Sequence, residues 1–102
     1  MKALEKTDIV SFLRNNKEKI YSYGVKQIGL FGSFVKDKQG KNSDIDILVE
    51  FGSDSLNYDN YINLALYLED NLARRIDLVT RDSLSPYIGP HILEEVEYVS
   101  LW

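Results

Sequence analysis

Two aspartates separated by a single residue, Asp44 and Asp46, are the side chains of this chain best suited to chemistry. They lie in residues 43–50, where apolar and polar residues alternate, which predicts a β-strand with both carboxylates on one face. Hard divalent cations such as Mg²⁺ bind carboxylate oxygens, usually together with substrate phosphates. An EF-hand loop also begins Asp-x-Asp, but Leu48 and Val49 stand where it needs an oxygen ligand and a glycine. The pair therefore predicts a metal site that serves a phosphate ligand, with two solvated strand acids as the alternative.

Gly32 and Ser33 end a second apolar segment, residues 25–31, which predicts a buried strand. A glycine and a hydroxyl at such a place allow backbone N–H groups to approach a phosphate, although a plain turn is the simpler interpretation. Asp77 lies in a third predicted strand, residues 75–80, and completes a cluster of three carboxylates if the strands are adjacent. The alternative for Asp77 is an exposed strand acid that faces a neighbouring arginine.

The remaining segments predict the helices that must position these residues. Helical spacing of apolar residues predicts a first helix over 8–22 and a second over 58–74, and a proline opens a short final helix at 90–96. The order helix, strand, strand, helix, strand, helix predicts an α/β or α+β fold, with helices covering one face of a small mixed sheet. The apolar arc of residues 58–74 is about twice as wide as one sheet-facing stripe needs. Its surplus, around Tyr61, Leu64 and Leu68, indicates either a protein interface or a helix buried on two sides.

Composition limits the function. A chain of 102 residues with 44% hydrophobic and 27% charged residues is expected to form a single domain, residues 1–102. Without cysteine and with one histidine, thiolate or histidine chemistry is not expected, so carboxylates and hydroxyls must act. The net charge of −4 argues against direct nucleic-acid binding and predicts that a polyanionic ligand arrives with divalent cations. No apolar run is long enough for a membrane span, so a cytoplasmic protein is expected.

The motifs form an ordered pattern of strand, Gly-Ser, a ten-residue spacing, Asp-x-Asp, helix and strand aspartate. In residues 30–34 (Leu-Phe-Gly-Ser-Phe), 43–51 and 75–79 the sequence resembles the minimal nucleotidyltransferases of the polymerase-beta superfamily. The resemblance runs over about residues 25–96. It implies a polymerase-beta-like nucleotidyltransferase fold.

The resemblance also implies roles for individual residues. Asp44 and Asp46 match the family's metal-binding pair, Asp77 matches its third carboxylate, and Gly32 and Ser33 match residues that contact the phosphates of the nucleotide. Two Mg²⁺ ions would then clamp a nucleoside triphosphate such as ATP and stabilise an in-line displacement that releases pyrophosphate. Asp77 is expected to help activate the attacking hydroxyl as well as to bind metal.

The sequence departs from the family pattern after its Gly-Ser. Many relatives continue Gly-Ser-x-Ala-Arg-Gly, whereas this chain has Val35, Lys36 and Asp37. Lys36 is assigned to nucleotide binding, but it lacks the guanidinium fork that holds phosphate with two hydrogen bonds. Asp37 lacks the backbone freedom of glycine. A weakened affinity for triphosphate is the expected consequence.

The shortness of the chain bears on its substrate. Free nucleotidyltransferases of this length resemble the antitoxins of two-gene modules whose partner is a HEPN-domain ribonuclease toxin. The implied reaction is transfer of AMP from ATP to a tyrosine of that partner. Two alternatives stay open, namely an inactive antitoxin of the same fold that acts by binding alone, and a nucleotidyltransferase for a small metabolite. The last would need copies of this chain to associate, because a single copy has little room for an acceptor pocket.

Overall fold

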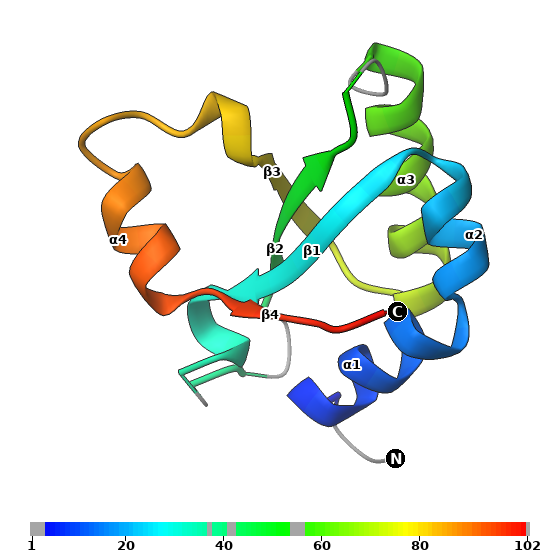
Figure 1. Ribbon diagram of the computed structural model, residues 1–102. Coiled ribbons are helices and arrows are strands. Elements are labelled where there is room, and N and C mark those ends of the chain that lie inside the picture. Colours follow the sequence, from blue (N-terminus) through cyan, green and yellow to red (C-terminus); the bar gives the residue numbers. More distant parts are fainter. Residues whose placement is uncertain (1–3, 37, 41–42, 54–56, 102) are drawn as a thin grey trace.

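A four-stranded mixed sheet organises the chain. The computed structural model describes residues 4–36, 38–40, 43–53 and 57–101, and its strand order is β3-β2-β1-β4 (Figure 1). β1 runs antiparallel to β2 and to β4, whereas β2 and β3 are parallel. Three strands were predicted and are confirmed within two residues at each end, but the short β4 was not predicted. The strands are β1 (Val25–Phe31), β2 (Ile45–Phe51), β3 (Ile76–Thr80) and β4 (Glu97–Tyr98).

The helices depart from prediction in one place. The single helix predicted over 8–22 is wrong, because the chain forms two helices that are separated at Asn16, whose φ is −119° and ψ is 25°. The side-chain amide of Asn16 donates to the carbonyl of Phe12 at 2.8 Å and so competes with the helical backbone. No helix in the described ranges has the length and apolar character to cross a membrane. The helices are α1 (Lys6–Asn15), α2 (Lys17–Ser22), α3 (Tyr58–Leu72) and α4 (Gly89–Glu95), with single 3-10 turns η1 (Gly32–Phe34) and η2 (Arg81–Ser83).

The helices lie on both sides of the sheet. α1, α2 and α3 stack on one side, while α4 lies on the other (Figure 1). The prediction that helices cover one face therefore holds for three of the four. α4 can approach the opposite face because β1 carries Gly29 there, where a Cβ would stand 2.7 Å from Cγ2 of Val96. The glycine thus permits the segment after α4 to pack directly on the sheet.

The core lies between the sheet and the first three helices. Leu64 and Leu68 of α3 are fully buried in the same cluster as Ile47 of β2. The hydroxyl of Tyr61 donates to the carbonyl of Leu78 in β3 at 2.5 Å. The interface interpretation is therefore wrong for Leu64 and Leu68, which are used inside the domain, and Tyr61 is partly buried against β3. Tyr58 and Leu66 of the same helix are exposed. Each fully buried leucine or isoleucine of this core stabilises the folded state by about 1.5–3 kcal/mol, because its apolar surface is removed from water.

Candidate active site

The register of β2 and β3 brings two of the three predicted carboxylates together. Asp46 is the direct pairing partner of Asp77 in this parallel pair, and side chains of paired residues project from the same face of a sheet. Asp46 is partly buried and Asp77 is exposed. The pair therefore presents one carboxylate to the protein and one to the solvent.

Gly32 packs against the inner carboxylate of this pair. Phe31, the last residue of β1, pairs with Asp46 across the antiparallel ladder, and the chain then turns into η1 with a φ of +76° at Gly32. A Cβ on Gly32 would overlap Oδ2 of Asp46 and stand 2.8 Å from its Cγ. Both the positive φ and the contact require glycine. The Gly-Ser turn and the aspartate pair thus form one site.

Crowded negative charge perturbs the ionisation of Asp46. Burial, the neighbouring charges of Asp77 and Asp44, a hydrogen bond with Asp77 and the charge of Glu95 together raise the pKa of Asp46 from 3.8 to about 6. Burial is the largest of these causes. A cation or a proton between the carboxylates would relieve the repulsion among them.

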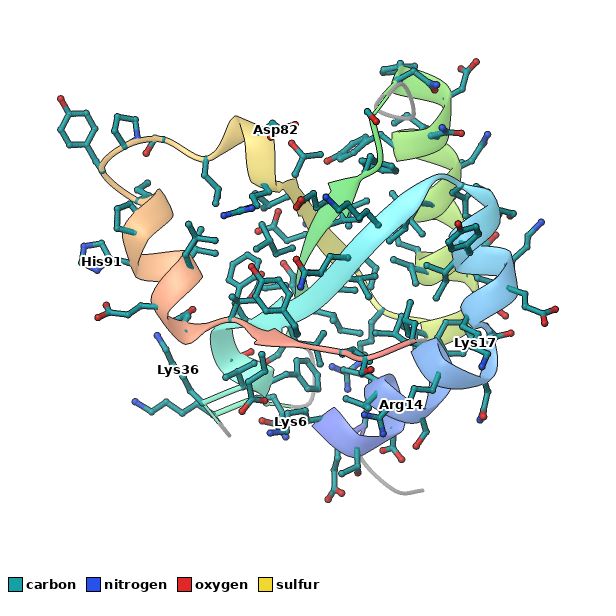
Figure 2. The ribbon with its side chains drawn as sticks, viewed as in Figure 1. Lys6, Arg14, Lys17, Lys36, Asp82 and His91 are labelled. Carbon is teal, nitrogen blue, oxygen red and sulfur yellow. The ribbon has the colours of Figure 1, made fainter. Side chains whose placement is uncertain are left out.

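Glu95, which sequence reasoning did not select, completes the surroundings of the glycine turn. Its Oε1 accepts a hydrogen bond from the backbone N–H of Gly32 at 3.0 Å, and its Oε2 forms an ion pair with Nζ of Lys36 at 3.1 Å. The hydrogen bond from Lys36 is the largest influence on the pKa of Glu95; burial acts against it, the Gly32 N–H reinforces it, and the pKa is lowered. Lys36 accordingly points from the turn after β1 towards the end of α4 (Figure 2). No sequence signal links these residues, because α4 and η1 meet only in the folded chain.

The turn after β1 also positions the other predicted nucleotide-binding residues. Ser33 follows Gly32 within η1, and the backbone N–H of Lys36 donates to the carbonyl of Gly32 at 3.1 Å. Gly32, Ser33 and Lys36 are therefore held in one tight turn. Asp37, the second departure from the family pattern, lies outside the described residues. His91 points outward from α4, away from this turn (Figure 2).

Asp44 lies one residue before β2, which begins two residues later than predicted, and its side chain is exposed. The backbone on either side of Asp44 is hydrogen-bonded to the two residues that precede β3, Arg74 and Arg75. Nη1 of Arg74 donates to the carbonyl of Ser43 at 2.9 Å, and the N–H of Ile45 donates to the carbonyl of Arg75 at 3.0 Å. The Arg74 guanidinium also lies 5.8 Å from the centre of the Phe34 ring. Arg74 is thus a positioning residue for Asp44 that the sequence did not reveal.

The site fits a hard cation in its donor chemistry. Asp44, Asp46 and Asp77 offer only carboxylate oxygens, which Mg²⁺ prefers. Within the described ranges, no three acidic or histidine side chains are arranged as a complete cation site. The register fixes Asp46 and Asp77 side by side, whereas Asp44 lies outside the strand ladder.

The comparisons with known proteins assign a family to this chain with a mixed sheet, paired carboxylates and a glycine turn. Residues 9–99 match the family described as nucleotidyltransferase domain, so the chain belongs to that family. It is 39% identical over 100 residues to the protein adenylyltransferase MntA of Thermococcus cleftensis, covering 97% of this chain and 100% of that protein. The predicted resemblance to minimal nucleotidyltransferases is confirmed.

Several solved structures resemble this fold, including the following two. One is a toxin-antitoxin complex with AMP-PNP, at 30% identity and a TM-score of 0.68, covering 87% of this chain and 72% of that chain. The other is a complex of a tri-AMPylated HEPN toxin of Shewanella oneidensis with an MNT antitoxin. It has 26% identity and a TM-score of 0.62, covering 91% of this chain and 71% of that chain. The predicted mixed α/β nucleotidyltransferase fold is confirmed.

Proposed function

We propose that this chain is a Mg²⁺-dependent protein adenylyltransferase that acts as an antitoxin by transferring AMP from ATP to a tyrosine of a partner HEPN ribonuclease toxin. The observation that carries the proposal is the pairing of Asp46 with Asp77 directly beside Gly32. In this proposal the aspartate pair binds the cation and the neighbouring glycine turn binds the phosphates. The chain also matches the whole length of the MntA relative. We place the reaction in the cytoplasm, where ATP and such a partner meet.

Each residue of the site has a role in this proposal. The N–H of Gly32, the Ser33 side chain and the Lys36 ammonium bind the phosphates. Asp44, Asp46 and Asp77 hold Mg²⁺, as two ions. When bound, Mg²⁺ neutralises the triphosphate and stabilises the incoming and departing oxygens.

The reaction is a substitution at the α-phosphorus. The tyrosine oxygen of the partner forms a bond to that phosphorus, the bond to the bridging oxygen of the β-phosphate breaks, and pyrophosphate leaves. The phenolic proton passes to Asp77, whose exposed carboxylate is accessible from solvent. The partner supplies the acceptor and therefore decides which hydroxyl is modified.

A binding-only antitoxin is the second candidate, and one observation favours it. Two of the three groups assigned to phosphate, the N–H of Gly32 and the ammonium of Lys36, already contact Glu95. If a nucleotide does not displace Glu95, the chain neutralises its partner by contact alone.

Mass spectrometry of the partner separates the two candidates. Purified toxin incubated with this chain and Mg²⁺-ATP is expected to gain the mass of one or more AMP groups on tyrosine. The double variant Asp44→Asn, Asp46→Asn should abolish this gain while the complex still forms on size-exclusion chromatography. Asp82→Asn, on the exposed turn after β3 (Figure 2), is the control for loss of a carboxylate elsewhere. An unchanged partner mass together with suppressed ribonuclease activity would establish the binding-only function.

A further inference from the structure

The carboxylate of Glu95 contacts two of the three groups to which the proposed function assigns phosphate binding, the N–H of Gly32 and the ammonium of Lys36. Oε1 accepts from the N–H of Gly32 at 3.0 Å, and Oε2 pairs with Nζ of Lys36 at 3.1 Å. Each oxygen thus takes one donor, as two oxygens of a phosphate group would. The contact comes from the last residue of α4, and the next residue, Val96, lies against Gly29 on the face of the sheet that carries Asp46.

The two donors cannot serve Glu95 and a phosphate fully at once. The backbone N–H of Gly32 has a single hydrogen, and the φ of +76° at this residue fixes its direction. Glu95 also adds its negative charge to the acidic site, since it contributes to the raised pKa of Asp46. An incoming triphosphate therefore meets both an occupied donor and a repelling charge.

We propose that Glu95 is an internal substitute for phosphate that occupies the phosphate-binding turn in the nucleotide-free protein and must be displaced by the nucleotide. The proposal rests on the proposed function, because it takes Gly32 and Lys36 as phosphate ligands. It makes Glu95 a residue that sets nucleotide affinity and selects for ligands with several phosphates. A single phosphate offers little more than the carboxylate that it replaces, whereas a magnesium-bound polyphosphate gains contacts to Asp46 and Asp77 as well.

The contact is suited to displacement. The Lys36 side chain is 53% exposed and that of Glu95 is 27% exposed, and ion pairs that are open to solvent are weak. Glu95 is the last residue of α4, so its side chain can rotate away without unfolding the helix. Lys36 is then free to turn towards the ligand.

Calorimetric titration with Mg²⁺-ATP and with magnesium pyrophosphate tests the proposal. Glu95→Gln keeps the size of the side chain but removes its charge, and it should bind both ligands about three- to tenfold more tightly than the native chain. Glu94→Gln removes the same charge from the exposed neighbour on the same helix and should leave both affinities unchanged. Glu95→Asp keeps the negative charge but has a shorter side chain. If contact of Glu95 with the turn lowers the ligand affinity of the native chain, this variant should also bind both ligands more tightly.

The amide resonance of Gly32 gives a readout that does not depend on activity. In the native chain it should move when pyrophosphate displaces Glu95, and in Glu95→Gln it should already be shifted before ligand is added. Thermal melts of each variant show whether the fold is kept.

The outcomes separate this inference from the proposed function. If the native chain binds Mg²⁺-ATP and Glu95→Gln binds equally or more weakly, Glu95 supports the site rather than occupying it, and only this inference fails. If neither the native chain nor either Glu95 variant binds Mg²⁺-ATP or pyrophosphate, the proposed function fails together with it.

Discussion

Asp46 of β2 and Asp77 of β3 are direct register partners in a parallel strand pair. Their side chains are held side by side by backbone hydrogen bonds that are independent of any ligand. Burial, followed by the neighbouring charges of Asp77 and Asp44, raises the pKa of Asp46. The sheet therefore stores a repulsion that cation binding relieves.

Magnesium should determine nucleotide affinity. Asp46→Asn removes one of the two fixed carboxylates, so the affinity for Mg²⁺-ATP should fall roughly tenfold or more, because the cation then offsets less of the triphosphate charge. Calorimetry with Mg²⁺ and with EDTA measures the effect, and Asp82→Asn is the matched control. Equal affinity of the native chain for ATP in the two conditions would contradict a role for the metal.

The stability of the magnesium-free protein should depend on the ionisation of Asp46. Its folded-state pKa of about 6 lies above the ordinary 3.8, so the folded state binds more protons than the unfolded state between these values. The contribution of protonated Asp46 to the stability of the folded state is complete below about pH 4 and is lost as the pH rises through 6. Asp46→Asn cannot ionise, so its thermal midpoint relative to the native chain should rise across this window.

Calorimetric melts in EDTA measure this difference. The native chain must be compared with Asp46→Asn at each pH. The lowered pKa of Glu95 gives both proteins a pH dependence of stability that runs in the opposite direction to that of Asp46. For Glu95, stability is present at higher pH and is lost as the pH falls. A constant difference in midpoint between about pH 4 and pH 8 would show that Asp46 does not titrate in this range.

The glycine of the Gly-Ser turn, Gly32, should not tolerate a side chain. Gly32→Ala forces a residue with a Cβ into a φ of +76°, which costs about 1–2 kcal/mol, and it overlaps the Asp46 carboxylate. Urea denaturation should show at least this loss, and Mg²⁺-ATP binding should be weakened as well. Gly40→Ala is the control, because a Cβ there meets only Oγ of Ser43, at an ordinary 3.7 Å. Equal losses in the two variants would refute a special role for Gly32.

Arg74 should support metal binding without contacting the metal. Arg74→Gln removes the hydrogen bond to the carbonyl of Ser43 and the contact with the Phe34 ring, which together hold the segment before Asp44. The apparent Mg²⁺ affinity should fall about tenfold, as it does when partners of metal ligands are removed. Arg74→Lys should restore part of the Mg²⁺ affinity. The control is Arg75→Gln, which should bind Mg²⁺ with the native affinity because the side chain of Arg75 is exposed. A purely structural role would lower the melting temperature and leave Mg²⁺ affinity unchanged.

The sequence alone was enough to predict the local features of this protein. The alternation of residues 43–50, the Gly-Ser turn and the strand around Asp77 could all be predicted, because strand patterning and turn chemistry depend on neighbours along the chain. The predicted helix over 58–74 was found within two residues for the same reason. The residue types also limited the chemistry to carboxylates, hydroxyls and backbone donors, because the chain has no cysteine and a single histidine.

The tertiary structure decided which of these features meet. The break at Asn16 depends on a side-chain hydrogen bond that helical periodicity does not encode. The side-chain oxygen Oδ1 of Asn16 also accepts a hydrogen bond from the hydroxyl of Tyr67 in α3 at 3.0 Å. β4 is too short to show a pattern and exists because it pairs with β1. The register of Asp46 with Asp77 and the contact of Glu95 with Gly32 join segments that are far apart in the sequence. Such contacts depend on how the sheet and the segment around α4 pack, so only the folded chain reveals that the turn at Gly32 already holds the carboxylate of Glu95.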